Sequence, residues 1–467
     1  MKKNVFHTRS VLALMLSLAV TACTTPPPYQ KPAMDVPGPF KESALWKTAR
    51  PDAATVPDDW WQLFNDPVLN DLQQQLAVGN ENLKASAAQV QVARAALATS
   101  RTATSPAVGA TAGISHGVNP GGVSPTTTNS IGASASWELD LWGRLSGAVS
   151  SAEARFQASS ADLAAARLSM QALLTQSYFS LRSAEAQSAL LERSVAAYQR
   201  SLELTQNRYT GGVASAADVA QATTQLRSTQ AQLVESLSAR ALLEHAIASL
   251  LGKPAAAFGL TRTATLPQAP VAPLQLPASL LERRPDIAAA ERRVAAANAQ
   301  IGVAQSAWFP AITLSANAGF RGVDLLELIS APNLFWSLGP SLAMAIFDGG
   351  ARKAAEESAQ ATSAQAAASY RQTVLAALQE VEDNLVISAS LEEEIVLQSD
   401  ALKAAERNLE IVNNQYKAGT VSYLNVVTAQ ATALTAERTL LDVRNRRLTA
   451  IVLLLKNLGG TWDAAKF

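Results

Sequence analysis

Two pairs of short segments alternate apolar residues with small or polar ones. In 108–115 and 131–141 every second residue is Val, Ala, Ile, Trp or Leu, and Gly, Thr, Ser, Glu or Asp stand between them. A similar alternation returns in 312–321 and 336–346. A period of two predicts β-strands with one apolar and one polar face. Such segments of about ten residues are typical of a transmembrane β-barrel, and a soluble sheet with one wet face is the alternative. Residues 117–130 contain Gly, Pro and Asn and predict an exposed loop.

Four longer segments contain neither Gly nor Pro. They are 148–210 (63 residues), 213–251 (39 residues), 351–418 (68 residues) and 420–458 (39 residues). Their Ala, Leu, Gln, Glu and Arg are strong helix formers. A helix of about 65 residues extends roughly 100 Å. Helices of this length indicate coiled-coil or helical-repeat packing.

The chain is internally duplicated. Tyr209, Gly212 and Ser215 recur 207 positions later as Tyr416, Gly419 and Ser422, within NRYTGGVASAADV (207–219) and NQYKAGTVSYLNV (414–426). The first strand of each half recurs at an offset of 204 (Pro106–Val108 and Pro310–Ile312). The predicted organisation is a signal peptide (1–22), a tether and strap (23–62), a first repeat (63–252), a linker (253–277), a second repeat (278–459) and a tail (460–467).

The N-terminus has the composition of an export signal. A basic start is followed by a short apolar stretch and by Val-Thr-Ala-Cys, which places the only cysteine, Cys23, where the apolar stretch ends. This arrangement resembles a bacterial lipobox, which implies cleavage before Cys23 and acylation of that residue; an ordinary signal peptide with a stray cysteine is the alternative. Thr24 in place of Asp points to the outer membrane. The residues that follow, TTPPPYQKPAMDVPGPF, predict an extended strap.

Composition and charge exclude several functions. The chain has 38 basic residues (Lys plus Arg) and 38 acidic residues (Asp plus Glu). Removal of the signal takes away Lys2, Lys3 and Arg9 and changes the net charge from 0 to −3. No basic surface for nucleic acid is therefore indicated. The three histidines are isolated in the sequence, and no phosphate-binding glycine loop with Lys and Ser or Thr occurs. We therefore expect no enzyme activity, no cofactor and no metal site. A lipoprotein enzyme remains as an alternative function, although no catalytic residues can be named for it.

Four strands cannot close a barrel in lipid, because about eight are needed and open edges are not tolerated there. The chain is therefore expected to contribute strands to an oligomer, and three copies of four strands would give twelve.

Two longer segments carry a resemblance to a known family. PDDWWQLFNDPVLNDL (57–72) and LLERRPDIAAAERRVAAANAQIGVAQSAWFPAITL (280–314) resemble signatures of the TolC-like outer-membrane efflux factors, in their lipoprotein (NodT-type) branch, which serves resistance–nodulation–division pumps. The resemblance covers nearly the whole mature chain. It implies an α+β membrane protein: a homotrimer with a twelve-strand barrel in the outer membrane and a long helical barrel in the periplasm. Its implied partners are a periplasmic adaptor, an inner-membrane pump and outer-membrane lipid.

The resemblance also implies roles for the two breaks between the long helices. They would be the periplasmic tips of helical hairpins that dock the adaptor; simple helix connections are the alternative. Glycines would supply the turn, and Ser215 and Ser422 would cap the next helices. The predicted docking residues are Tyr209, Gly211, Gly212, Val213, Ser215, Tyr416, Gly419, Thr420, Val421 and Ser422.

Just beyond the second tip, members of this family close the channel with inward-facing side chains, often acidic ones. The matching positions are Leu424, Asn425 and Thr428, which are not acidic, so this chain departs from an anionic ring. Asp218, the counterpart of Asn425 in the first repeat, would be the remaining acid. A solvated helix surface is the alternative for each. The differences between the tips suggest that the second hairpin moves.

Several other side chains carry open assignments. Glu138, Asp140 and Arg321 would line the channel lumen or lie at strand ends. Trp60 and Trp61 are expected to pack the strap onto the helices rather than bind a ligand. The function these expectations indicate is an outer-membrane exit duct for small molecules such as drugs. A type I protein-secretion outlet and a structural coiled-coil lipoprotein remain as alternatives.

Overall fold

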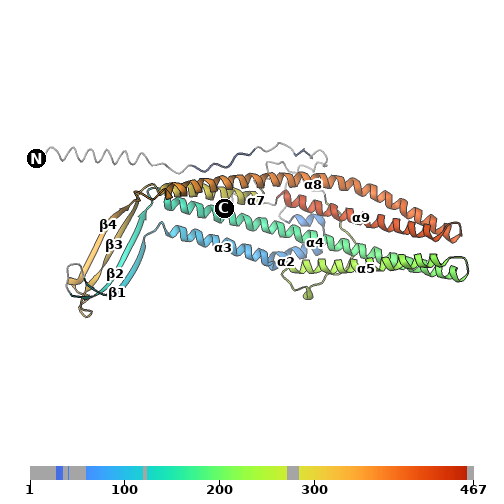
Figure 1. The fold of residues 1–467 in the computed structure, drawn as a ribbon, viewed down its shortest axis with the longest axis horizontal. Helices are drawn as coiled ribbons and strands as arrows, with labels where there is room; N and C mark the ends of the chain where they lie inside the picture. The colour runs from blue at the N-terminus through green and yellow to red at the C-terminus, as the bar shows by residue number, and fades with distance from the viewer. Residues whose placement is uncertain (1–27, 35–39, 42–58, 119–123, 271–282, 460–467) are drawn as a thin grey trace. The chain divides into compact units, whose positions relative to one another are not determined.

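The four alternating segments form one antiparallel sheet in the computed structural model, which describes residues 28–34, 40–41, 59–118, 124–270 and 283–459. The strands lie side by side in chain order (Figure 1). They are β1 (Ala107–Gly117), β2 (Thr126–Leu139), β3 (Ala311–Gly322) and β4 (Leu334–Ala343). Each half of the chain thus contributes one hairpin to a common sheet.

The strand register aligns the apolar positions on a single face. One row across the sheet pairs Val108 with Ala135, Ala135 with Ala316 and Ala316 with Leu338. Directly paired residues share a face, so the predicted apolar faces of all four strands are continuous. On the other face Gly132 pairs with Gly319, and a Cβ at residue 319 would lie only 2.3 Å from a backbone oxygen of β2. Glycine is required there for the close approach of the two strands.

Two sequence-based boundaries in the sheet are wrong. β2 begins at Thr126, so 126–130 belong to a strand and not to the predicted loop. The β-branched threonines of this segment favour extended backbone, and they pair with the end of β1 as far as Gly117. β4 ends at Ala343, so Met344 and Ile346 lie beyond the strand although they continue its alternation.

The helices show the same duplication as the strands. The 67-residue α4 and α8 are followed by the 35-residue α5 and α9, and α3 and α7 have 22 residues each. These lengths confirm the predicted fold class, an internally duplicated α+β chain. The helical elements are η3 (Trp60–Phe64), α2 (Pro67–Gly79), α3 (Glu81–Thr102), α4 (Arg144–Thr210), α5 (Ala216–Leu250), η4 (Ala255–Ala257), α7 (Pro285–Ser306), η5 (Ala331–Asn333), α8 (Ala351–Lys417) and α9 (Tyr423–Asn457).

The two 67-residue helices, α4 and α8, each start a few residues after an aspartate that follows the sheet. The Asp140 carboxylate accepts hydrogen bonds from the backbone N–H groups of Leu145 (2.8 Å) and Ser146 (2.7 Å). Asp348 accepts from the backbone N–H groups of Gly350 (3.0 Å) and Arg352 (3.1 Å). A carboxylate satisfies the unpaired N–H groups of a helix start, so both helices begin where the sequence supplies one.

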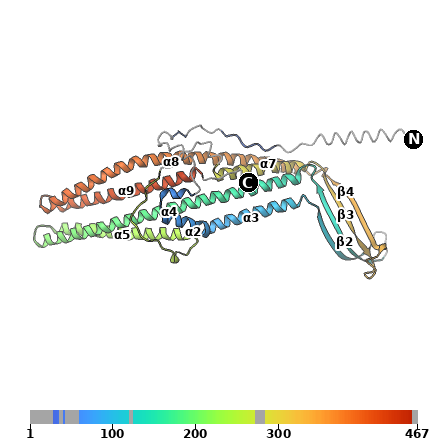
Figure 2. The same cartoon turned by 180° about the vertical axis from the view of Figure 1, so that it is seen from behind.

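The described chain divides into two compact units. One contains the sheet, with residues 88–118, 124–160 and 289–372, and the strap residues 28–34. The other contains residues 59–87, 161–270, 283–288 and 373–459, with residues 40–41. In the second unit α5 folds back beside α4, and α9 folds back beside α8 (Figures 1 and 2).

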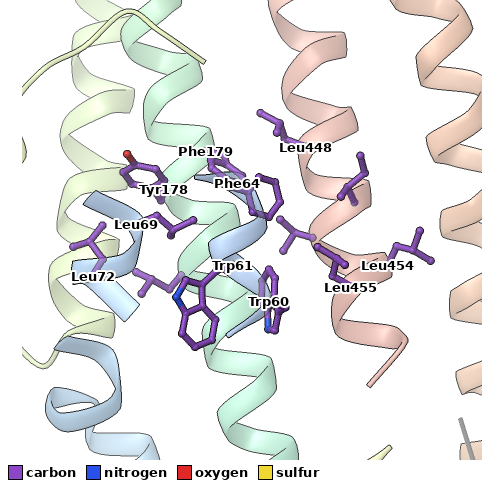
Figure 3. Close-up of a cluster of buried hydrophobic side chains, with 14 of the residues drawn as sticks. Trp60, Trp61, Phe64, Leu69, Leu72, Tyr178, Phe179, Leu448, Leu454 and Leu455 are labelled. Atoms are coloured by element: carbon purple, nitrogen blue, oxygen red, sulfur yellow. The ribbon is translucent and has the colours of Figure 1, made fainter. Parts of the chain in front are cut away.

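The second unit has a hydrophobic core in which both repeats meet. Trp60, Trp61 and Phe64 of η3 are buried together with leucines of α2. They pack on Phe179 of α4, and side chains of α9 complete the cluster (Figure 3). The expectation that Trp60 and Trp61 pack onto the helices is confirmed. This core ties the N-terminal part of the second unit to both long hairpins.

Among the residues that the structure describes, none of the helices is both long enough and apolar enough to cross a membrane.

Candidate functional site: the tips of the two helical hairpins

Both hairpin tips use one turn geometry. At the first tip the backbone N–H of Gly212 donates to the Tyr209 oxygen (2.9 Å), and that of Val213 donates to the Arg208 oxygen (2.8 Å). At the second tip the backbone N–H of Gly419 donates to the Tyr416 oxygen, and that of Thr420 donates to the Gln415 oxygen, each at 3.0 Å. These pairs define a Schellman motif, whose left-handed residue is normally glycine. Gly212 and Gly419 take that position with φ of 74° and 78°.

The starts of the following helices differ. Ser215 and Asp218 form a capping box at the start of α5: the Asp218 N–H donates to Ser215 Oγ (3.2 Å), and the Ser215 N–H donates to Asp218 Oδ2 (2.8 Å). Ser422 is the N-cap of α9 but accepts no side-chain capping bond. An amide, Asn425, stands where the first repeat has its carboxylate. The prediction that both serines cap their helices is therefore correct for Ser215 only.

The tyrosines of the two tips lie in different environments. Tyr209 has 49% of its surface exposed, whereas Tyr416 has 7% and Tyr423 has 2%. The rings of Tyr416 and Tyr423 lie 5.3 Å apart, edge to face, and the Tyr423 hydroxyl lies 3.1 Å from Ser201 Oγ of α4. Burial raises the pKa of the Tyr423 hydroxyl, so this group stays protonated. The second tip therefore packs against the first hairpin through its aromatic side chains.

Arg208 joins the two hairpins. It lies at the end of α4, and its guanidinium donates to the backbone oxygens of Tyr416 (3.0 Å) and Lys417 (3.4 Å). The guanidinium carbon also lies 4.7 Å from the centre of the Tyr416 ring. A cation is favourable at the negative end of a helix, and here the end is that of α8. We call this set of contacts the Arg208 link.

The predicted aperture residues lie on one face of α9. Leu424 is 55% exposed, and Asn425 and Thr428 are also exposed. The opposite face of the same turn carries Tyr423 and Val426, which are buried against the first hairpin. The arrangement leaves a surface with an apolar Leu424 and two neutral polar side chains. Asp218 is half-buried, and its carboxylate is engaged in the capping box.

Sequence reasoning missed Arg208 and the packing role of Tyr423. The available signal was the mismatch between repeats: Arg208 corresponds to Gln415, whereas the tyrosine that follows each of them is the same. Because eight of the thirteen paired positions in 207–219 and 414–426 differ, this mismatch alone does not single out Arg208.

The charged residues near the sheet organise the junctions between strands and helices. Arg144 of α4 makes two bonds to the Glu138 carboxylate (2.8 and 2.6 Å), and Asp140 caps the same helix. Burial opposes ionisation of Asp140, but the backbone N–H bonds outweigh it and lower the pKa of this carboxyl. Arg321 on β3 lies 5.0 Å from the Phe335 ring centre on β4. Glu138 and Asp140 thus fit the strand-end assignment.

Cys23, the predicted acylation site, lies outside the described residues. Within the described part of the chain, no group of three or more His, Cys, Asp or Glu side chains is placed to hold a metal ion.

Comparisons with known proteins agree with this architecture. The antibiotic efflux pump outer membrane protein ArpC of Pseudomonas putida is 33% identical over 96% of this chain and 96% of its own. A solved structure of the outer-membrane channel OprN has a TM-score of 0.86 and 31% identity over 94% of this chain and 100% of that one. The open state of the Neisseria gonorrhoeae MtrE outer membrane channel has a TM-score of 0.83 and 26% identity over 95% of this chain and 99% of that one.

The duplicated helical hairpins and the four-stranded sheet thus define an outer-membrane channel protein. A family model described as outer membrane efflux protein matches residues 72–253 and 276–460. The chain belongs to the outer membrane efflux protein family and is the outer-membrane channel of an efflux system. The predicted family, function and outer-membrane location are confirmed.

Proposed function

We propose that three copies of the chain form a closed duct that carries small molecules from a periplasmic adaptor to the cell exterior. The observation that carries this proposal is the open sheet: β1 and β4 are its edge strands, and their apolar side chains are largely exposed. Val108 is 77% exposed and Trp336 is 75% exposed. An apolar sheet face suits lipid, but lipid does not tolerate unpaired edge groups. Pairing β4 of one copy with β1 of the next closes a twelve-stranded barrel without edges.

The apolar surface of the long helices supports the same assembly. In the second compact unit Val234 of α5 and Leu397 of α8 are 68% and 63% exposed. Apolar residues exposed on helices that are otherwise well packed indicate contact with another protein surface. Neighbouring copies would cover these residues in a helical barrel.

The hairpin tips would dock the adaptor. Both tips present the same Schellman turn, and six such turns would ring the periplasmic end of a trimer. The first tip offers exposed apolar side chains, among them Val213 (69% exposed) and Tyr209. An adaptor with small apolar residues at its own helical tips would bury these side chains.

The second hairpin would form the aperture. Leu424 would give an apolar constriction, with Asn425 and Thr428 as neutral polar neighbours. Opening would require α8 and α9 to leave α4, and this motion breaks the Arg208 link. A related channel, MtrE of Neisseria gonorrhoeae, has been solved in an open state.

The lipid anchor, the pump and the cargo complete the proposal. Acylation at Cys23 would hold the chain at the outer membrane, since each buried CH₂ contributes about 0.8 kcal/mol. The chain itself would bind no cofactor and perform no catalysis, so an inner-membrane pump of the resistance–nodulation–division type would supply the energy. Drug-like molecules are the proposed cargo, because ArpC is described as part of an antibiotic efflux pump.

Site-specific photo-crosslinking tests the docking assignment. A photoreactive amino acid at Val213 is expected to capture the adaptor in cells whose efflux depends on this chain. The control is Val234, which is exposed to nearly the same degree in the single chain (68% against 69%) but lies along α5, where a neighbouring copy would cover it, so it should capture a second copy of the chain and not the adaptor. Capture of the adaptor at Val234 and not at Val213 would contradict tip docking. Capture of secreted polypeptides in place of an adaptor would favour the protein-secretion outlet.

A further inference from the structure

A polar groove lies between the two helical hairpins of the second compact unit. Its volume of about 530 Å³ falls within the range of roughly 300–1,000 Å³ that is typical of sites for small molecules. α5 and α9 supply most of the lining, which is rich in amides and hydroxyls and includes Gln225, Ser228 and Thr435. Two charged side chains, Arg438 and Asp442, complete it. Such a lining suits a polar ligand, because an apolar one would leave these groups without partners.

The two charges of the groove are available to a ligand. Arg438 and Asp442 are one turn apart on α9, and both are exposed. Arg438 Nη1 donates to Gln232 Oε1 of α5 (3.0 Å). Within the described part of the chain this is the only hydrogen bond of the guanidinium, and the Asp442 carboxylate has neither a hydrogen bond nor an ion pair. Since a guanidinium has five N–H donors, most of them remain free.

The groove continues the face of α9 that carries the predicted aperture. Six exposed residues follow one another on this helix at alternating intervals of four and three positions: Leu424, Thr428, Ala431, Thr435, Arg438 and Asp442. This spacing keeps their side chains on one face of the helix. The proposed aperture requires Leu424 and Thr428 to face the lumen of the duct. The same orientation opens the groove into the lumen.

The groove is separate from the aperture. Thr435 and Asp442 follow Leu424 by 11 and 18 residues (435 − 424 and 442 − 424), which correspond to about 16 and 27 Å at 1.5 Å per residue. Ser228 on α5 is the counterpart of Thr435 in the first repeat (435 − 228 = 207), and both are exposed and line the groove. Both repeats thus turn the same position toward this site.

We propose that the groove binds zwitterionic small molecules on their way through the duct. Arg438 binds the carboxylate of the ligand, and Asp442 binds its ammonium group. The amides and hydroxyls between the hairpins bind the polar groups that join the two charges. An arginine can hold a carboxylate through two parallel N–H donors, which favours this charge over other acceptors. The inference rests on the proposed function, because the aperture assigned to Leu424 and Thr428 gives the groove its luminal orientation.

Equilibrium dialysis of the purified full-length protein, with the same detergent on both sides, tests the binding. The probe is ciprofloxacin, a fluorescent molecule with a carboxylate and an ammonium group at neutral pH. Two derivatives each lack one charge: the methyl ester has no carboxylate, and the N-acetyl form has no ammonium group. Since both protein charges are exposed, we expect the zwitterion to bind about three- to fivefold more tightly than either derivative.

Two variants assign the charges of the ligand to residues. In Arg438→Gln the zwitterion and its methyl ester should bind equally, and in Asp442→Asn the zwitterion and the N-acetyl form should bind equally. The matched control is Arg193→Gln on α4. The partner of Arg193, Glu437 (2.8 Å), is next to Arg438 in the sequence but does not line the groove. This control should leave all three dissociation constants unchanged. A preference for the zwitterion over the ester that survives Arg438→Gln, or no preference in the parent, would overturn the inference.

Single-channel recording separates the inference from the duct itself. A molecule bound in the lumen obstructs the current, so ciprofloxacin should reduce the conductance of the parent. Asp442→Asn should need about three- to fivefold more ciprofloxacin for the same reduction. Binding in dialysis without any reduction of the current would overturn the luminal position of the groove. Charge-dependent binding to a protein that conducts no current would support the zwitterion site and contradict the duct.

Discussion

The Arg208 link is expected to hold the second hairpin in the closed arrangement. Arg208→Met keeps the aliphatic length of the side chain and removes its charge and its donors. The Tyr416 and Lys417 backbone oxygens, at 3.0 and 3.4 Å, would lose a charged partner. Because this contact joins α4 to α8, its loss should favour departure of the second hairpin without unfolding either one.

The size of the effect follows from the contacts. A hydrogen bond to a charged group contributes about 1.5–3 kcal/mol. The cation–ring contact with Tyr416 adds about 0.5–1 kcal/mol at a partly exposed site. The link is therefore worth about 2–4 kcal/mol in each protomer. At 1.4 kcal/mol for each factor of ten, its removal should shift the ratio of open to closed hairpins roughly 30- to 700-fold per protomer.

Single-channel recording of the purified protein in planar bilayers measures this shift as open probability. The control is Arg407→Met on α8, whose partner Glu410 lies 2.6 Å away but whose side chain is 68% exposed. Such a surface pair contributes at most about 1 kcal/mol, so its loss should leave gating nearly unchanged. An Arg208→Met channel whose open probability changes less than threefold, or no more than the control, would refute the reasoning.

Three further predictions concern the tips and the second repeat. Gly212→Trp with Gly419→Trp should abolish efflux by disturbing the docking tips. Oligomers should still form, because only about 1–2 kcal/mol of backbone strain arises at each turn. Unchanged drug resistance would contradict tip docking. Ser215→Ala should lower the stability of the start of α5 by about 1 kcal/mol and speed hydrogen exchange in its first turn about fivefold. Ser422→Ala removes no capping bond and should leave hydrogen exchange at α9 unchanged. Equal effects of the two substitutions would contradict the difference in capping between the tips. Burial of Asp286 opposes ionisation, but the bond from Arg284 at 2.7 Å outweighs it and lowers the pKa of this carboxyl. The stabilisation is therefore fully present above the unfolded pKa of about 3.9 and is lost as pH falls through the lower folded value. The difference in thermal unfolding between the parent and Asp286→Asn should be largest at pH 7 and should shrink steadily as the pH is lowered below about 3.9; a difference that does not change with pH would contradict the assignment.

Local patterns were sufficient to predict most of the fold. Alternation in β1 and β3 and the long segments without Gly or Pro reflect short-range physical chemistry, which a single sequence displays. The repeat added long-range information, because equal spacing in the two halves implies equal elements. Errors arose at element ends, such as Thr126 and Ala343, where pairing with a neighbouring strand decides how far the ladder extends.

The contacts that distinguish the two tips were not predictable in the same way. Arg208 and Tyr416 are 208 positions apart, and their contact depends on how two hairpins pack. The Tyr29 hydroxyl donates a hydrogen bond to the Glu291 carboxylate, 262 positions away, and no repeat relates the two segments. Local patterns carry no information on such pairs. The cap at Ser215 was predictable, but the same residue type at Ser422 makes no capping bond, which the residue type alone does not reveal.

The central claim is that several copies of this chain close one transmembrane duct. The most direct test is to purify the full-length protein, determine the mass of the particle and record its conductance in a planar bilayer. The account predicts a particle of three chains that produces discrete conductance steps of uniform size. A stable single chain in the membrane, or a three-chain particle without conductance even when the Arg208 link is removed, would contradict it.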